Sequence, residues 1–292
     1  MMSDFEQVFI IFNPNSTGDS KTIAKDFRKA IKAFQPSLKV KLCETTHAGH
    51  AEELGYQLSK KFPSCLLVSV SGDGGYHELI NGAMSAVDEG AAEPICTVLP
   101  GGNANDHYSF VSKRSLLEAI EANGLTRLDL LKVVSTKTRY AHSYVGLGLT
   151  PRVALELNKH DLTLVKEMWL SLRTFWRLKP FRIIQADKTY RLDSLIMANI
   201  GVMAKHLTLD DNSSPRDGKF EVLRWSHSHK LRLVIQILRS AVGAVDSPRS
   251  VEQFEFITVS NILMQLDGEI EKLKAGQKVL VTSAHRKLRT YR

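Results

Sequence analysis

The sequence predicts a two-domain chain: an N-terminal α/β domain with a parallel sheet, followed by a mostly antiparallel, β-rich second domain. Three observations support this prediction. In the first half, apolar strand-like runs alternate with segments of helical periodicity, the pattern of a parallel sheet covered by helices. After about Arg127 the strand-like runs follow one another closely, with tight turns between them, which is typical of antiparallel pairing. The length of 292 residues is ample for two such domains.

The alternation in the first half gives eight predicted elements. Helical periodicity is clearest where apolar residues recur three or four positions apart, as at Ile23, Phe27 and Ile31. The predicted strands are Val8–Phe12, Val40–Cys43, Cys65–Val70 and Ile95–Leu99. The predicted helices are Lys21–Phe34, Ala51–Lys60, Tyr76–Val87 and Arg114–Ala122.

The second half is predicted to be mainly strands, interrupted by two helices, Leu162–Leu178 and Lys230–Val245. The first of these helices combines Trp169 and Trp176 with basic residues, which fits both a core helix and a membrane-surface helix; the core interpretation is favoured. The predicted strands are Leu128–Val134, Tyr140–Val145, Arg182–Gln185, Tyr190–Met197, Phe220–Trp225, Phe254–Val259, Leu263–Leu266 and Lys278–Thr282.

Composition excludes disordered and fibrous proteins. The hydrophobic fraction of 43% and charged fraction of 24% are those of a globular chain. No apolar run approaches the roughly 18–20 residues needed to cross a bilayer, and the N-terminus lacks the features of a secretory signal. Cys43, Cys65 and Cys96 lie far apart and are expected to be reduced thiols of a cytoplasmic protein.

The net charge of +8 fits an anionic partner, whether nucleic acid, anionic lipid or nucleotide, and does not decide among them. The chain has no basic run and no recognisable DNA- or RNA-binding motif, so we expect no nucleic-acid partner.

The segment with the strongest functional signal is Val70–Gly82, VSGDGGYHELING, which follows a strand and opens a helix. Gly72, Gly74 and Gly75 let the backbone approach a phosphate closely, and N–H groups at a helix N-terminus point at a bound anion. Asp73 would repel phosphate unless it binds Mg²⁺ or accepts a proton, so its presence favours phosphoryl chemistry. A tight turn capped by an aspartate is the alternative interpretation.

Three weaker motifs accompany this segment. Pro100–Asp106, PGGNAND, follows the next predicted strand, so both loops are expected at the same carboxyl edge of the sheet, where ligands bind in open α/β folds. Asn13–Gly18, NPNSTG, ends the first strand, and Asp267-Gly268-Glu269 lies between late strands. Each of the three taken alone also fits an ordinary turn.

Taken together and in this order, the motifs resemble the diacylglycerol-kinase catalytic family, which includes bacterial lipid kinases and the sphingosine and ceramide kinases. Asn13-Pro14 is similar to the family's first-strand motif, Ser71–Glu78 to its Gly-Gly-Asp-Gly-Thr loop, and Gly102–Asp106 to its Gly-Thr-Gly-Asn-Asp loop. The late Asp267-Gly268-Glu269 is similar to a motif that carries a proposed proton acceptor.

The resemblance implies a two-domain lipid kinase, with residues 1–126 as the nucleotide-binding α/β domain and 127–282 as the lipid-substrate domain. Residues 283–292 are expected to pack back on the first domain. ATP and Mg²⁺ are the implied cosubstrate and metal. The implied catalytic residues are Glu269, which would accept the proton of the lipid hydroxyl, and Asp73; Asp217 is the implied site of a structural Mg²⁺. The implied nucleotide-binding residues are Asn13, Thr45, Ser71, Gly72, Asp73, Gly74, Gly75, Tyr76, His77 and Asn103.

The implied partners are a lipid substrate, phosphorylated for phospholipid biosynthesis or signalling, and the inner surface of the membrane, where the protein would bind peripherally. The oligomeric state is left open, with a homodimer as one option.

The sequence departs from the family pattern at Ser71, Gly75, Asn103 and Ala104. Asn103 replaces a threonine, and an amide donates hydrogen bonds without relaying a proton. Two alternatives therefore stay open: a nucleotide- or lipid-binding regulator without catalysis or with an altered substrate, and another kinase of the superfamily, similar to the NAD kinases.

Overall fold

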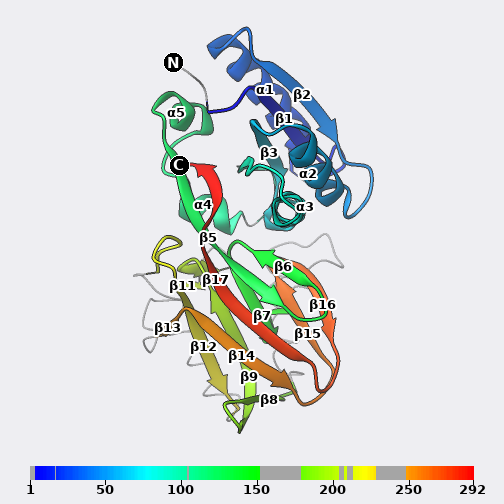
Figure 1. The fold of residues 1–292 in the computed structure, drawn as a ribbon, viewed down its shortest axis with the longest axis vertical. Helices are drawn as coiled ribbons and strands as arrows, with labels where there is room; N and C mark the ends of the chain where they lie inside the picture. Colours follow the sequence, from blue (N-terminus) through cyan, green and yellow to red (C-terminus); the bar gives the residue numbers. More distant parts are fainter. Residues whose placement is uncertain are drawn as a thin grey trace. The chain divides into compact units, whose positions relative to one another are not determined.

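The computed structural model describes residues 4–16, 18–103, 105–151, 179–203, 207–208, 213–227 and 248–292. The helices predicted at Leu162–Leu178 and Lys230–Val245 lie outside these ranges. The chain divides into two compact units, Met1–Asp129 with Arg286–Arg292, and Leu130–His285. The predicted fold class is confirmed, because the first unit has a parallel sheet with helices and the second is built from antiparallel strands (Figure 1).

The first unit is built on four parallel strands in the order β2-β1-β3-β4. Strands β1, β3 and β4 are mostly buried and β2 is partly exposed; apolar side chains of the sheet form one core with those of α1. The strands are β1 (Gln7–Phe12), β2 (Lys39–Glu44), β3 (Cys65–Ser71) and β4 (Ile95–Pro100). The helices are α1 (Ser20–Phe34), α2 (His50–Lys61), α3 (Asp73–Asp88), α4 (Asp106–Val111) and α5 (Leu116–Glu121).

Helices α2 and α3 pack against each other unusually closely, because a glycine lies at the contact on each helix. A Cβ atom on Gly82 would overlap the carbonyl oxygen of Glu52, and one on Gly55 would lie 2.6 Å from the carbonyl oxygen of Leu79. This contact lies between the first half of α2 and the middle of α3, and residues near the start of each helix line the cavity described below.

The second unit is an antiparallel assembly in the order β16-β15-β7-β9-β8-β14-β17, with β12 paired to β9 and to β13. Its core contains Leu147, Leu195, Phe256 and Met264. The strands are β5 (Leu125–Val134), β6 (Thr138–Ala141), β7 (Tyr144–Gly148), β8 (Phe181–Gln185), β9 (Lys188–Ala198), β10 (Val202–Met203), β11 (Leu207–Thr208), β12 (Phe220–Ser226), β13 (Arg249–Val251), β14 (Gln253–Thr258), β15 (Ile262–Leu266), β16 (Glu269–Leu273) and β17 (Lys278–Tyr291).

Strand β17 is much longer than the predicted Lys278–Thr282, and its last residues belong to the first unit. There Arg289 pairs in parallel with Ile95 of β4. Tyr291 is buried, stacks edge-on against Phe5 and donates a hydrogen bond to Asp4. The C-terminal strand therefore forms part of the core of the first unit.

One predicted strand, Tyr140–Val145, is wrong, because the structure has two strands there, β6 and β7, with a turn at His142 and Ser143. The cause is the buried carboxylate of Asp267, which accepts backbone N–H groups of His142 at 2.7 Å, Ser143 at 2.8 Å and Tyr144 at 3.0 Å. A carboxylate that satisfies three buried donors stabilises the turn strongly.

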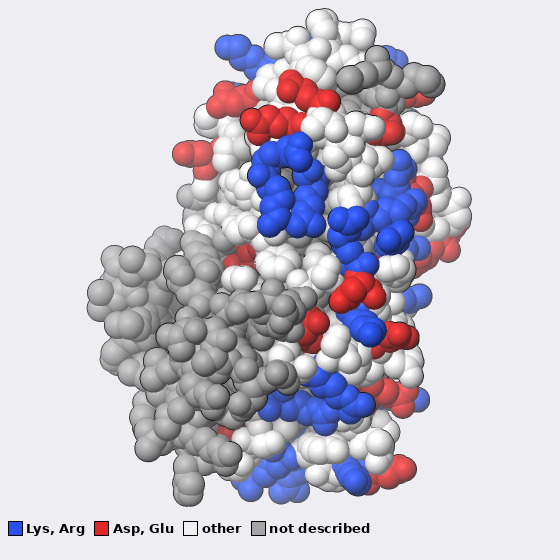
Figure 2. All heavy atoms as spheres, turned by 90° about the vertical axis from the view of Figure 1, so that its left-hand side faces the viewer, with Lys and Arg blue, Asp and Glu red and all other residues white. Residues whose placement is uncertain are grey.

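Positive charge is clustered on one face of the described part of the chain (Figure 2). On the face shown in Figure 2, Lys and Arg side chains form several groups with acidic side chains between them. Within the described part of the chain, no helix combines the length and the hydropathy that crossing a bilayer would require.

Candidate functional site

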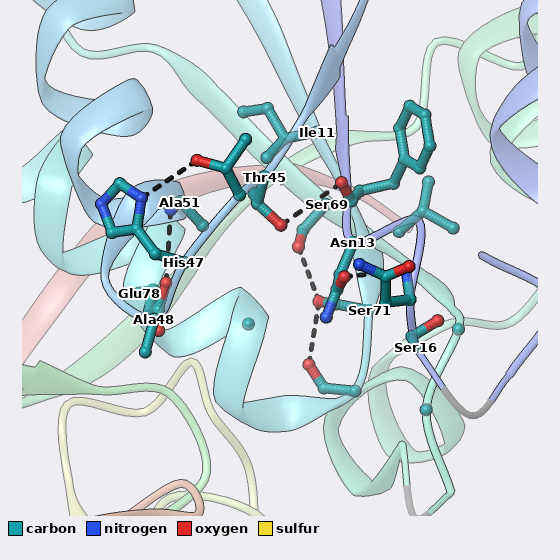
Figure 3. A pocket seen from close by; sticks show the side chains of 18 residues that line it. Ile11, Asn13, Ser16, Thr45, His47, Ala48, Ala51, Ser69, Ser71 and Glu78 are labelled. Carbon is teal, nitrogen blue, oxygen red and sulfur yellow. Dashed lines mark hydrogen bonds between the residues drawn. The ribbon is translucent and has the colours of Figure 1, made fainter. Parts of the chain in front are cut away.

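All four parallel strands of the first unit end at one cavity of about 480 Å³ (Figure 3). The residue that follows each strand lines it: Asn13 after β1, Thr45 after β2, Gly72 after β3 and Gly101 after β4. The chain passes from β1 outward to β2 and then returns to β3 on the other side of β1. This reversal of strand order is where open α/β sheets bind their ligands, and the volume is that of a small-molecule site.

The N-terminus of α3 borders the cavity. Strand β3 ends at Ser71 and α3 begins at Asp73, so Gly72 alone connects them. Much of the segment expected as a glycine loop is therefore the first turns of a 16-residue helix. The first N–H groups of a helix have no partner within it and carry a partial positive charge, which favours an anion at this end.

A pair of serine hydroxyls lies on the same side of the cavity in Figure 3 as Asn13. Ser69 and Ser71 are hydrogen-bonded through their Oγ atoms at 2.7 Å, and Ser71 also donates to the carbonyl of Gly72. Gly75 leaves room for this arrangement, because a Cβ atom there would lie 2.7 Å from the Cβ of Ser71. The departures Ser71 and Gly75 are thus neighbours in space, and a hydroxyl at 71 occupies the space beside 75.

The two glycine loops are in backbone contact. A Cβ atom on Gly102 would overlap Cα of Gly72 and lie 2.7 Å from its nitrogen. The Gly101 amide donates to the carbonyl of Ser71 at 3.0 Å. Within the second loop, the Asn105 side chain accepts a hydrogen bond from the Gly102 amide and donates one to the Gly102 carbonyl. The loops form one rigid edge of the cavity.

Asp73 joins the same two loops from the other side. Its carboxylate accepts the backbone N–H groups of Asp106 at 3.0 Å and His107 at 3.1 Å, at the start of α4. The sequence favoured a role in phosphoryl chemistry for this carboxylate, with an aspartate that caps a turn as the alternative. The structure gives it a structural contact as well, and this contact explains why α4, which the sequence did not predict, begins where it does.

Glu78 was not among the predicted site residues, although it lines the cavity. Its carboxylate accepts the backbone N–H groups of Gly49 at 2.9 Å and Ala51 at 3.3 Å, at the start of α2. Gly49 has a φ of +85°, which favours glycine. Glu78 therefore fixes the segment after β2 against α3, a contact between residues 29 positions apart that local sequence patterns do not show.

His47, also missed by sequence reasoning, presents an imidazole on the wall of the cavity across from Asn13 and Ser71 in Figure 3. Its ring stacks on that of His50, with centroids 4.8 Å apart and planes inclined by 6°. Its two nitrogens contact Thr46 Oγ1 at 3.0 Å and Glu53 Oε1 at 3.3 Å. The side chain is held in one orientation although it is 53% exposed.

The structure brings five predicted nucleotide-binding residues together around the cavity: Asn13, Thr45, Ser71, Gly72 and Gly75. Gly74 lies in the first turn of α3, and Asn103 is exposed in the second loop. The side chains of Tyr76 and His77 are buried; Tyr76 donates to the carbonyl of Cys96, and His77 is hydrogen-bonded to Asn81. Neither residue lines the cavity, and the Tyr76 amide already donates to the carbonyl of Gly72 at 3.2 Å.

The second unit carries the other two predicted residues. Glu269 is exposed at the start of β16, directly after a turn in which Asp267 and Gly268 have φ values of 49° and 111°. Asp217 is exposed and accepts the backbone N–H of Lys219. In the described ranges, no three or more His, Cys, Asp or Glu side chains are grouped so as to hold a metal ion.

The three cysteines are free thiols. Burial raises the pKa of Cys65 to about 12 and also raises the pKa of Cys43 and Cys96. A thiol with a raised pKa stays protonated at neutral pH and is a poor nucleophile. We therefore expect no cysteine chemistry at the cavity.

Comparison with known proteins supports the family predicted from the motifs. Residues 7–133 match the model of the diacylglycerol kinase catalytic domain. Sphingosine kinase 1 of Rattus norvegicus is 28% identical over 203 residues, which are 63% of this chain and 51% of that protein. Sphingoid long-chain bases kinase 1 of Arabidopsis thaliana is 29% identical over 152 residues, 48% of this chain and 20% of that protein. The chain thus spans about half the length of the rat relative.

The fold has a close match among solved structures. A diacylglycerol kinase from Bacillus anthracis str. Sterne superimposes with a TM-score of 0.75 at 16% identity, covering 100% of this chain and 99% of that one. At this identity the match establishes the two-domain fold. The resemblance that the motifs predict is confirmed by the family match over residues 7–133 and by the sphingosine and sphingoid-base kinase relatives.

Proposed function

We propose that this chain, whose residues 7–133 carry the diacylglycerol kinase catalytic domain, is a lipid kinase that transfers the γ-phosphate of ATP to a lipid hydroxyl. The observation that carries the proposal is the cavity at the carboxyl ends of the four parallel strands, bordered by the N-terminus of α3. A diacylglycerol-like or sphingoid lipid is the substrate class, since the named relatives act on sphingosine and sphingoid bases.

ATP would bind in this cavity through contacts that match its parts. The N-terminus of α3, with the Ser71 hydroxyl and the glycine backbones of both loops, suits the phosphates. Asn13 and Thr45 supply polar groups to the sugar or phosphates, with Asn103 at the rim. His47 provides a flat ring for the base, and bases stack favourably on aromatic side chains.

The transfer itself requires positioning and charge neutralisation more than covalent help. The oxygen of the lipid hydroxyl forms a bond to the γ-phosphorus, and the bond from that phosphorus to the bridging oxygen of the β-phosphate breaks. The hydroxyl proton passes to a carboxylate, for which Glu269 is the leading candidate and Asp73 the second. ADP and the phosphorylated lipid are the products.

Mg²⁺ would accompany ATP. It is usually held by one or two protein carboxylates together with substrate phosphates and water. A site with few carboxylates fits that mode, and Asp73 is the carboxylate nearest in sequence to the phosphate-binding turn. When bound, the ion would neutralise charge on the phosphates. We place Asp217 in a separate, structural Mg²⁺ site in the second unit, beside a turn that it already closes.

The protein is proposed to work in the cytoplasm at the inner surface of the membrane, as a peripheral protein, because its substrate resides there. Its product would enter phospholipid biosynthesis or lipid signalling. A regulator that binds nucleotide without catalysis is the alternative favoured by one feature, the exposed Asn103 in place of a threonine.

Nucleotide binding is tested by a substitution that forces the loop at Gly102 away from the loop at Gly72. Replacing Gly102 by valine places a branched side chain against the backbone of Gly72. We expect at least a tenfold loss of MgATP affinity in calorimetry, and a stability loss of about 1–3 kcal/mol from overpacking. Ala92→Val, a similar enlargement in an exposed loop, is the matched control and should bind MgATP normally. Unchanged affinity in Gly102→Val would rule out this edge as the phosphate site.

The contribution of His47 is tested by comparing two ligands. His47→Ala should weaken ATP binding about tenfold, since base stacking on an aromatic side chain contributes about 1–3 kcal/mol. Tripolyphosphate, which has no base, should bind the variant and the wild type equally. His47→Phe should restore most of the affinity for ATP. Equal losses for ATP and tripolyphosphate would show that His47 contacts phosphate or supports the fold instead.

A further inference from the structure

A second cavity, of about 550 Å³, lies in the second unit at the ends of several strands. Its apolar lining comes from Phe181 at the start of β8, Ile262 and Leu263 at the start of β15, and Leu273 at the end of β16. Nothing in the proposed transfer reaction uses this cavity.

The charged residues of this cavity are all cationic. Lys179, Lys272 and Lys274 line it and are exposed, and no acidic residue joins them in the lining. Within the described ranges, none of the three lysines forms an ion pair. Nearby Lys278, by contrast, is paired with Glu255 at 2.8 Å. The charge of the three lysines is available to an anion.

The loop that begins at Lys274 is held by hydrogen bonds within itself and to the segment between β14 and β15. The Ala275 amide donates to Asn261 Oδ1 at 2.9 Å, and the Gly276 amide donates to the carbonyl of Thr258 at 2.7 Å. The Lys274 amide donates to Gln277 Oε1 at 2.9 Å. A site on such a scaffold requires little ordering of the backbone when a ligand binds.

An exposed apolar residue stands beside the cavity. Val259 is 40% exposed, immediately before the lining residues Ser260 and Asn261. Ile262 and Leu263 are themselves only partly buried. A lining that combines lysines with apolar residues, next in sequence to an exposed valine, matches a ligand that has a negative head and a hydrocarbon part.

The cavity is distant from the turn that carries Glu269. Its lining residues Ile262 and Leu273 are at the open end of the β15–β16 hairpin, whereas Asp267 and Gly268 form its turn. Each strand is five residues long, so its ends are four residue steps apart, which corresponds to about 13 Å at roughly 3.3 Å per residue. A head group at the lysines would thus not be the group that reacts at Glu269.

We propose that this cavity binds an anionic phospholipid of the bilayer surface, separate from the lipid that accepts phosphate. The lysines contact the phosphate-containing head group, and Val259 with the partly buried leucine and isoleucine contacts the acyl region. The site attaches the second unit to anionic membranes whether or not ATP is present.

The test is vesicle sedimentation without nucleotide, using phosphatidylcholine vesicles with and without phosphatidylglycerol. The variant Lys179→Gln/Lys272→Gln/Lys274→Gln should lose roughly hundredfold in affinity for phosphatidylglycerol vesicles, at about fivefold per lysine near an anionic surface. The control Lys21→Gln/Lys25→Gln/Lys29→Gln removes the same charge from the exposed face of α1 and should bind within a few-fold of wild type.

A second variant separates a bilayer lipid from a soluble anion. Val259→Ser keeps the charge and should still weaken vesicle binding severalfold, and soluble glycerol phosphate should not displace the vesicles. Equal losses in the two triple variants would show non-specific attraction and overturn the proposal. Displacement by glycerol phosphate, with no effect of Val259→Ser, would overturn it in favour of a soluble anion site. Circular dichroism of each variant excludes unfolding as the cause.

Discussion

Replacing Glu269 by glutamine is expected to lower kcat by roughly 10²–10⁴-fold, the usual contribution of a general base. Glutamine has the same shape and cannot accept a proton at neutral pH. The turn that presents Glu269 should persist, because it is anchored by the buried carboxylate of Asp267, which holds the backbone of His142, Ser143 and Tyr144. The affinity for MgATP should not change, since Glu269 does not line the cavity of the first unit.

The matched control is Glu271→Gln, two residues further along β16 and on the same side of the strand. Glu271 is paired with Lys137 at 3.0 Å and Arg139 at 3.7 Å, so its carboxylate is engaged in ion pairs within the second unit. Its loss should leave kcat near wild type. If Glu269→Gln turned over normally, the base would have to be another group, and Asp73 would be the remaining candidate.

Replacing Asp73 by asparagine is expected to reduce phosphate transfer by at least about 10³-fold, the larger part of it through the lost charge at the phosphates and metal. The variant is also expected to lose stability, because the Asp73 carboxylate accepts hydrogen bonds from the backbone N–H groups of Asp106 and His107. Asparagine retains one acceptor oxygen, so a stability loss of about 1–2 kcal/mol is expected from the weakened contact.

Three measurements on the same variant separate the two contributions of Asp73: thermal unfolding, MgATP affinity and transfer rate. A fully folded variant with little transfer supports a direct part in the reaction. Asp88→Asn, at the other end of α3 and paired with Lys287 at 3.2 Å, controls for the loss of one carboxylate in the same helix. Wild-type turnover in Asp73→Asn would remove Asp73 from the mechanism.

Local patterns were sufficient to predict the parallel sheet of the first unit. The buried strand Cys65–Val70 is mostly a run of apolar residues, and α1 has apolar residues at a helical period. Each pattern reflects which side chains of that one element are buried, so it can be read from the local sequence. The cavity could be located for the same reason, because the motifs follow consecutive strands and parallel strands end at one edge.

The features that sequence reasoning missed depend on contacts between distant residues. The turn at His142 depends on Asp267, which is 125 positions away. The start of α4 depends on Asp73, and the orientation of α2 on Glu78. Strand β16 has the sequence EIEKL, with charged residues at three of five positions, so its composition did not indicate a strand before its pairing with β15 was known.

The central claim is that the chain transfers phosphate from ATP to a lipid hydroxyl, and its most direct test is product formation. The purified protein is incubated with γ-labelled ATP, Mg²⁺ and mixed micelles containing diacylglycerol, sphingosine or ceramide, and the lipids are then separated. We expect the label in a phosphorylated lipid with the wild type, and almost none with Glu269→Gln or Asp73→Asn. Normal MgATP binding with no label in any lipid would contradict a lipid kinase and favour the non-catalytic regulator.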